Sequence, residues 1–271
     1  MHPPRFYNFV FLLIMLVWIM PVTDLAGQVA PPEGVGIDER SGGRIPATAA
    51  FKDQDGNLVT LAKYFDGSHP VVIAPVYFSC PNLCNLVLNG LLDAVLREKK
   101  FIPGKDYTIL SYSINPEETI QLAQAKRKSY VEKFPDDVTK DIRKGWHFLT
   151  GSQQDIDALS KALGFYYKKD GEDYLHPAVI IFLTPDGRIS RYLYGVDYPD
   201  SDYRLALLEA AQGKIGDVID SVLMYCYSYD PVTKRYNILA WRVMRIGSIG
   251  LAILFLIALG IVGYRYRKKG K

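Results

Sequence analysis

Two stretches of the chain are continuously apolar, VVIAPVYF at residues 71–78 and AVIIFL at residues 178–183. Runs of this kind are expected of strands that are buried on both faces of a sheet. Elsewhere, apolar residues recur at helical spacing or in short extended runs. The predicted strands are 71–78, 107–114, 146–149 and 178–183, and the predicted helices are 83–99, 117–134, 152–163 and one that begins within 204–212.

Turn-forming residues predict two β-hairpins, one over 51–61 and one that joins 178–183 to 189–194 through the turn 184–187. Strands that alternate with helices imply an α/β architecture with right-handed crossovers. A β-α-β unit followed by a helix and a hairpin outlines a thioredoxin-like fold, in which helices flank a central mixed sheet.

Three residues make local predictions. Pro75 lies inside the first apolar run, and because proline cannot donate to a sheet it predicts a bulge or pairing on one side only. Asn115 is expected to cap the helix 117–134, and Ser152 the helix 152–163.

Both ends of the chain carry membrane-type patterns. An apolar run of 14 residues, 9–22, follows Arg5 and is shorter than the about 20 residues that span a bilayer. It favours a signal peptide over residues 1–26, with an uncleaved N-terminal anchor as the alternative. Residues 246–264 are 19 residues without charge, followed by a basic cluster in 265–271. They predict one transmembrane helix with a cytoplasmic tail.

These patterns divide the chain into parts with different roles. Residues 27–47 are expected to be a linker or an extended strap, 48–225 the folded domain, and 226–245 a tyrosine-rich segment next to the membrane. The expected location is the cytoplasmic (inner) membrane, with the domain on the extracytoplasmic, periplasmic side.

Composition and charge narrow the function classes. The chain has 271 residues, 49% hydrophobic and 23% charged, which excludes collagen-like, disordered and disulfide-dense proteins. The net charge of +3 comes from the C-terminal end, where residues 241–271 hold seven Lys or Arg and no acid. Residues 27–240 hold 24 basic and 28 acidic residues, so the domain has no electrostatic footprint for nucleic acid.

The candidate chemistry lies in the segment SCPNLCN, which contains Cys80 and Cys84 and stands where the first buried strand gives way to a helix. A helix N-terminus stabilises thiolates, and cysteines one helical turn apart can share one ion or form a disulfide. Two thiolates favour Cu(I) and tolerate zinc. The alternative is a pair of buried core cysteines. The spacing alone does not separate redox chemistry from metal binding.

The histidines add one further candidate. His176 immediately precedes the strand 178–183, and in a thioredoxin-like fold the loop entering that strand faces the cysteine loop. Its imidazole would complete a set of two sulfurs and one nitrogen, which suits copper. His69 is expected in an exposed loop and His147 in a half-buried strand. Cys226 is expected in an interfacial amphipathic segment, the alternative being a third thiol that reaches the metal or a partner.

Several motifs occur together and in order: YFSCPNLC at 77–84, SINPEE at 113–118, WHFLTG at 146–151, and His176 followed by TPDG at 184–187. In this the chain resembles the Sco/SenC family of copper chaperones. The resemblance implies a membrane-anchored, thioredoxin-like protein that helps to assemble the dinuclear copper centre of cytochrome c oxidase. It also implies copper, as Cu(I) or Cu(II), bound by Cys80, Cys84 and His176.

The implied partners are the copper-bearing oxidase subunit, other copper chaperones and thioredoxin-like reductants. The chain departs from the family pattern at Asn85, Leu175 and Asn115, where the family commonly has Pro, Asp and Asp. These positions adjoin the ligands, so they affect how the metal is tuned rather than whether it binds. A cis peptide bond is expected between His176 and Pro177, as before the corresponding strand of thioredoxin-like proteins.

The leading functional hypothesis is a non-enzymatic metallochaperone. The alternative is a thiol-disulfide oxidoreductase that reduces partner cysteines, with Cys80 as the attacking thiol and Cys84 as the resolving one. A peroxidase of the peroxiredoxin type is disfavoured because the chain has no Thr-x-x-Cys motif.

Overall fold

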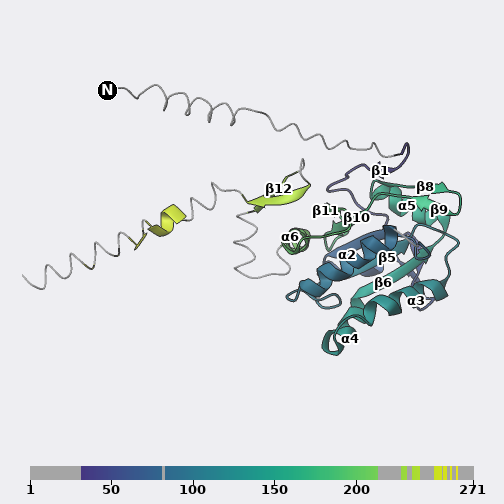
Figure 1. Cartoon of the computed structure of the whole chain (residues 1–271), viewed down its shortest axis with the longest axis horizontal. Helices are drawn as coiled ribbons and strands as arrows, with labels where there is room; N and C mark the ends of the chain where they lie inside the picture. Colours follow the sequence, from purple (N-terminus) through teal and green to yellow (C-terminus); the bar gives the residue numbers. More distant parts are fainter. Residues whose placement is uncertain are drawn as a thin grey trace, which may run out of the picture. The chain divides into compact units, whose positions relative to one another are not determined.

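A mixed sheet of seven strands organises the domain (Figure 1). Its spatial order is β11-β10-β4-β5-β6-β2-β3. The three central strands β4, β5 and β6 are parallel, and their neighbours β10 and β2 run antiparallel to them. The strands are β2 (Ala50–Lys52), β3 (Leu58–Thr60), β4 (Val71–Val76), β5 (Thr108–Ser113), β6 (Trp146–Gly151), β10 (Val179–Leu183) and β11 (Ile189–Tyr194). The predicted mixed α/β sheet and both predicted hairpins are confirmed.

The computed structural model describes residues 32–80, 83–212, 227–230, 234–238 and several residues between 247 and 261. None of the helices in that part of the chain is long and apolar enough to cross a membrane. The predicted signal segment 1–26, Cys226, the tail 265–271 and most of the predicted span 246–264 lie outside the described residues. Within 226–245, the strands β12 (Tyr227–Asp230) and β13 (Arg235–Ile238) form an antiparallel hairpin.

Three of the helices lie side by side. The helices are α2 (Leu83–Arg97), α3 (Ile120–Val131), α4 (Asp136–Gly145), α5 (Gln153–Ala162) and α6 (Asp200–Ala211), with a short 3-10 helix η1 (Leu61–Tyr64). Tyr130 of α3 donates a hydrogen bond to Asn89 of α2, at 2.9 Å. Arg97 of α2 pairs with Asp200 of α6. Helix α2 is therefore held between α3 and α6.

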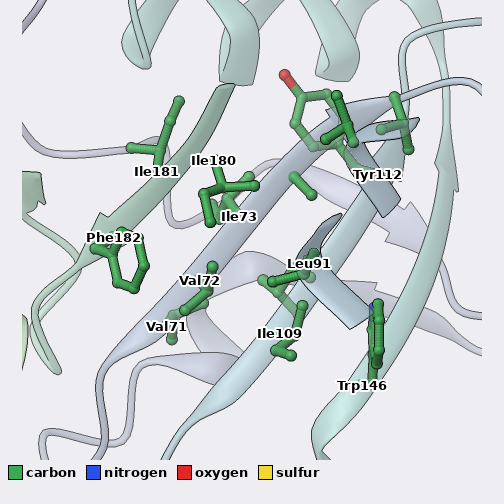
Figure 2. Close-up of a cluster of buried hydrophobic side chains, with 14 of the residues drawn as sticks. Val71, Val72, Ile73, Leu91, Ile109, Tyr112, Trp146, Ile180, Ile181 and Phe182 are labelled. Atoms are coloured by element: carbon green, nitrogen blue, oxygen red, sulfur yellow. The ribbon is translucent and has the colours of Figure 1, made fainter. Parts of the chain in front are cut away.

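The core lies along the central strands. Side chains of β4, β5, β6 and β10 gather there with Leu91 of α2, as Figure 2 shows. All six residues of β4 are buried, which explains its unbroken apolar sequence. Pro75 pairs with Tyr112 of β5, whereas the pairing of β4 with β10 stops at Ile73. The predicted one-sided pairing at Pro75 is confirmed.

A segment before the first sheet strand is attached to the fold. β1 (Gly36–Ile37) pairs with β7 (Phe165–Tyr166), and the Asp38 N–H donates to the Gly164 carbonyl at 2.8 Å. Gly164 has a φ of +63°, and a Cβ there would meet the Asp38 oxygen at 1.8 Å. Only glycine allows this close approach.

Several local predictions are corrected. Helix α3 begins at Ile120 with Thr119 as its cap, whereas Asn115 caps a preceding turn by accepting from the Glu117 N–H. Residues 136–145, left unassigned, form α4, and α6 begins four residues before 204. A further hairpin, β8 (Lys168–Asp170) with β9 (Asp173–Leu175), was not predicted.

The expected cis peptide bond before Pro177 is wrong, since the described residues contain no cis bond. An X-Pro bond favours the trans form by about 0.5–1 kcal/mol.

Candidate metal centre

The two candidate cysteines lie at the end of β4 and the start of α2. Cys80 follows the strand by four residues, and Cys84 is the second residue of the helix. Both are free thiols, with exposed fractions of 4% for Cys80 and 0% for Cys84. The predicted junction is confirmed, and it buries both sulfurs beneath the surface of the domain.

His176 reaches the cysteines because of how β10 pairs with β4. The antiparallel register joins Val71 to Leu183 and Ile73 to Ile181, so the start of β10 lies beside the end of β4. His176 stands just before β10 and is 6% exposed. Its Nε2 lies 2.9 Å from the sulfur of Cys84. The fold thus joins two residues 92 positions apart into a buried sulfur–nitrogen pair.

The hydrogen bonds define the protonation of this pair. The Nδ1 of His176 lies 3.0 Å from the Pro177 carbonyl oxygen, which can only accept. Nδ1 therefore carries the proton, and the lone pair of Nε2 faces Cys84. Burial lowers the pKa of His176. Burial also raises the pKa of Cys84 well above its usual range, although the Tyr77 N–H donates to its sulfur at 3.3 Å. The pair is a neutral thiol that donates to a neutral imidazole.

This result corrects one sequence-based expectation. The helix N-terminus was expected to stabilise thiolates, but at Cys84 desolvation outweighs that effect. The neighbouring Cys80 and the Glu118 carboxylate raise the pKa of Cys84 further. A soft metal ion would have to displace the proton of the Cys84 thiol before the sulfur could bind it. The Nε2 of His176 already offers its lone pair.

A carboxylate holds the loop that leads to Cys80. Glu118 accepts from the N–H groups of Phe78 and Ser79, at 2.7 and 2.6 Å. It also accepts from the hydroxyls of Ser79 and Ser113, at 2.7 and 2.6 Å. Four donors converge on one carboxylate, which fixes the chain between β4 and the first cysteine.

Aromatic rings enclose the histidine. Tyr77 meets the His176 ring edge-on at 6.1 Å between centroids, and Phe165 lies at the same distance on another side. Tyr174 packs against Tyr77 at 5.4 Å, and the Tyr77 hydroxyl donates to Asp173 at 3.1 Å. The rings restrict the orientations open to the imidazole and keep water from the sulfur–nitrogen pair.

The structure brings together part of the predicted ligand set. Among the described residues, no three His, Cys, Asp or Glu side chains are already gathered closely enough to hold a metal ion. Cys84 contacts His176, and the side chain of Cys80 interacts with that of Cys84. His69 is exposed and contacts Asp66 at 3.2 Å, and His147 lies in β6. Neither belongs to the site, as predicted.

The family model described as SCO1/SenC matches residues 38–207, which is more than half of the chain. The chain belongs to the SCO1/SenC family. The matched range contains both cysteines and His176. The resemblance seen in the sequence motifs is therefore confirmed across the domain.

Individual proteins are similar to parts of this chain. The human mitochondrial SCO1 homolog is 28% identical over 126 residues, which is 43% of this chain and 38% of that protein. The match thus spans less than half the length of this curated relative. A crystal structure of a protein from Aquifex aeolicus VF5 is 26% identical with a TM-score of 0.56, covering 64% of this chain and 95% of the other. The copper-bound ScoI of Arabidopsis thaliana is more distant, at 20% identity and a TM-score of 0.41, covering 57% and 88%.

Two further contacts connect the start of α2 with Cys80 and with α3. The Asn85 side-chain amide donates to the Cys80 carbonyl at 2.9 Å. Lys126 of α3 donates to the Asn85 side-chain oxygen. Sequence reasoning assigned no role to Glu118, in the turn before α3, or to Lys126 of α3, because the pattern of α3 does not show what the helix and its preceding turn contact.

Proposed function

We propose that this chain is a metallochaperone that binds one copper ion through Cys80, Cys84 and His176 and passes it to the dinuclear copper centre of cytochrome c oxidase. The observation that carries the proposal is the 2.9 Å contact between the Cys84 sulfur and the His176 Nε2. Two sulfurs and one imidazole nitrogen form a soft ligand set that suits copper. Membership in the SCO1/SenC family supports the same choice of metal.

The proposed delivery proceeds by ligand exchange with the copper-bearing oxidase subunit. A donor with three ligands is coordinatively open, so an incoming cysteine of the acceptor can bind before Cys80 or Cys84 leaves. Other copper chaperones and thioredoxin-like reductants are proposed partners for loading and for keeping the two thiols reduced. The chain itself then catalyses no reaction.

Membrane attachment is part of the proposal. The uncharged segment 246–264 would anchor the chain, with the basic residues of 265–271 in the cytoplasm. Residues 1–26 would act as the export signal, and the domain would face the extracytoplasmic side of the inner membrane. Such tethering confines the domain to the surface where an integral oxidase is assembled.

Anaerobic titration of the reduced full chain in detergent with Cu(I) tests the copper site. We expect one equivalent to bind the wild type, and His176→Ala and Cys80→Ser to weaken binding by at least about tenfold, because each removes one ligand. His69→Ala is the matched control, since its histidine is exposed and precedes β4, whereas the cysteines follow that strand. Stoichiometric binding of equal strength in all four proteins would refute the proposed ligand set.

A thiol-disulfide oxidoreductase remains the second candidate, favoured by two free thiols in a thioredoxin-like fold. In that function Cys80 attacks a partner disulfide and Cys84 resolves the mixed disulfide, so the partner is reduced and the pair becomes oxidised. His176→Ala separates the candidates. It would leave disulfide reduction intact while copper binding is lost.

A further inference from the structure

A lysine of α3 is linked to the cysteine segment through Asn85. The Nζ of Lys126 lies 2.5 Å from the Asn85 Oδ1, and the Asn85 Nδ2 donates to the Cys80 carbonyl at 2.9 Å. Asn85 also directly follows Cys84 in the chain. One asparagine side chain thus links an ammonium group to the segment that holds both cysteines.

Lys126 is half-buried between α2 and α3, where its charge is screened less than that of a surface lysine. Burial lowers its pKa, and the sulfurs of Cys84 and Cys80 act in the opposite sense by favouring the ammonium form. This places the lysine within electrostatic reach of both thiols.

Two carboxylates lie beside the site, and that of Glu118 also attracts the Lys126 ammonium electrostatically. Glu118 accepts the four hydrogen bonds that hold the loop before Cys80. Asp173 accepts from the Tyr77 hydroxyl. Lys126, by contrast, donates its hydrogen bond to the neutral amide oxygen of Asn85, which does not cancel the charge of the ammonium group.

We propose that Lys126 is a positioning residue whose charge makes the Cys80–Cys84–His176 site prefer Cu(I) to Cu(II). The inference rests on the copper function proposed above. When Cu(I) binds, two thiols release two protons to water, and the two thiolates, the metal and the neutral imidazole together carry one negative charge. When Cu(II) binds with the same release of protons, the group is neutral.

A single positive charge nearby acts differently on these two products. It attracts the anionic Cu(I) group and leaves the neutral Cu(II) group nearly unaffected. Lys126 therefore stabilises the reduced complex selectively. A role confined to holding α2 against α3 would not distinguish the two ions, because their ligands are the same.

The test measures both affinities for the full chain in detergent. Cu(I) affinity is measured anaerobically by competition with bicinchoninate, and Cu(II) affinity by competition with glycine. The variants are Lys126→Met, which keeps the length without the charge, and Lys126→Arg, which keeps the charge. Lys128→Met is the matched control, because Lys128 is an exposed residue of the same helix that faces Glu132 at 3.8 Å.

We expect Lys126→Met to weaken Cu(I) binding about tenfold, ~1.4 kcal/mol, and to change Cu(II) binding by less than about twofold. Lys126→Arg and Lys128→Met should keep both affinities near those of the wild type. Equal losses for the two ions in Lys126→Met, or no loss for either, would overturn the inference while leaving the copper function standing. A wild type that takes up neither ion would instead refute the copper function and, with it, this role of Lys126.

Discussion

Desolvation sets the chemistry of individual residues in this domain. Cys84 is fully buried and His176 nearly so, and both are held in their neutral forms by the loss of water. Copper uptake must then release the thiol protons, so binding is expected to weaken as pH falls. In the proposed site, protons therefore compete with copper for the Cys84 sulfur.

His147 shows the same effect away from the site and gives a testable dependence of stability on pH. Burial, with Arg127 and Lys63 nearby, lowers its pKa from 6.5 to about 4. The Tyr64 ring packs on the imidazole at 4.9 Å between centroids. Between pH 6.5 and pH 4, His147 is mostly protonated in the unfolded chain and mostly neutral in the folded chain. The contribution of His147 to the free energy of unfolding is therefore fully present above pH 6.5 and decreases as pH falls towards 4.

We expect the wild type to lose about 2 kcal/mol of unfolding free energy through His147 between pH 7 and pH 5. Urea unfolding of the wild type and His147→Gln at both pH values measures this contribution. The variant should lose less than the wild type by about that amount, whatever its stability at pH 7. His69→Gln is the control, since His69 lies in an exposed loop. An identical loss in wild type and His147→Gln would show that His147 does not cause it.

At the scale of elements, the turn before α3 acts as a clamp on the segment between β4 and α2. Glu118 accepts hydrogen bonds from the Phe78 and Ser79 N–H groups and from two hydroxyls. Its removal leaves backbone donors without their charged acceptor. We expect Glu118→Ala to lower the free energy of unfolding by about 2–3 kcal/mol, measured by urea unfolding. The stability of Glu118→Gln should lie between those of Glu118→Ala and the wild type.

Glu117 is the matched control for this measurement. It is the exposed neighbour of Glu118, and its 3.6 Å contact with Lys169 is a surface ion pair. Glu117→Ala should therefore cost less than about 1 kcal/mol. If Glu118→Ala were no more destabilised than Glu117→Ala, the clamp would not contribute to the stability of the domain.

The elements differ in how far the sequence predicts them. The strands β4 and β10 are evident because both faces are buried and every position is apolar. Helix α4 was missed because its sequence DDVTKDIRKG offers only two apolar residues for its inner face. Its start does carry a usable pattern, a proline followed by two aspartates, and α6 begins in the same way after Pro199. Acidic residues after a proline are therefore the indication that would have found α4 and placed the start of α6.

At the scale of the whole molecule, the site depends on strand order rather than on local sequence. The motif around Cys80 and Cys84 is visible in the chain, but His176 becomes a ligand candidate only because β10 lies beside β4. The predicted thioredoxin-like fold supplied that placement in advance. Lys126 and Glu118 could not be predicted, because their roles depend on which side of α2 the helix α3 lies. The expected thiolate at Cys84 failed for a related reason, since burial is a property of the folded chain.

X-ray absorption at the copper edge of the Cu(I)-loaded full chain tests the account most directly. The account predicts two sulfur scatterers and one nitrogen scatterer per copper, with the nitrogen contribution lost in His176→Ala and one sulfur lost in Cys80→Ser. A copper environment without sulfur, or one that His176→Ala leaves unchanged, would contradict it.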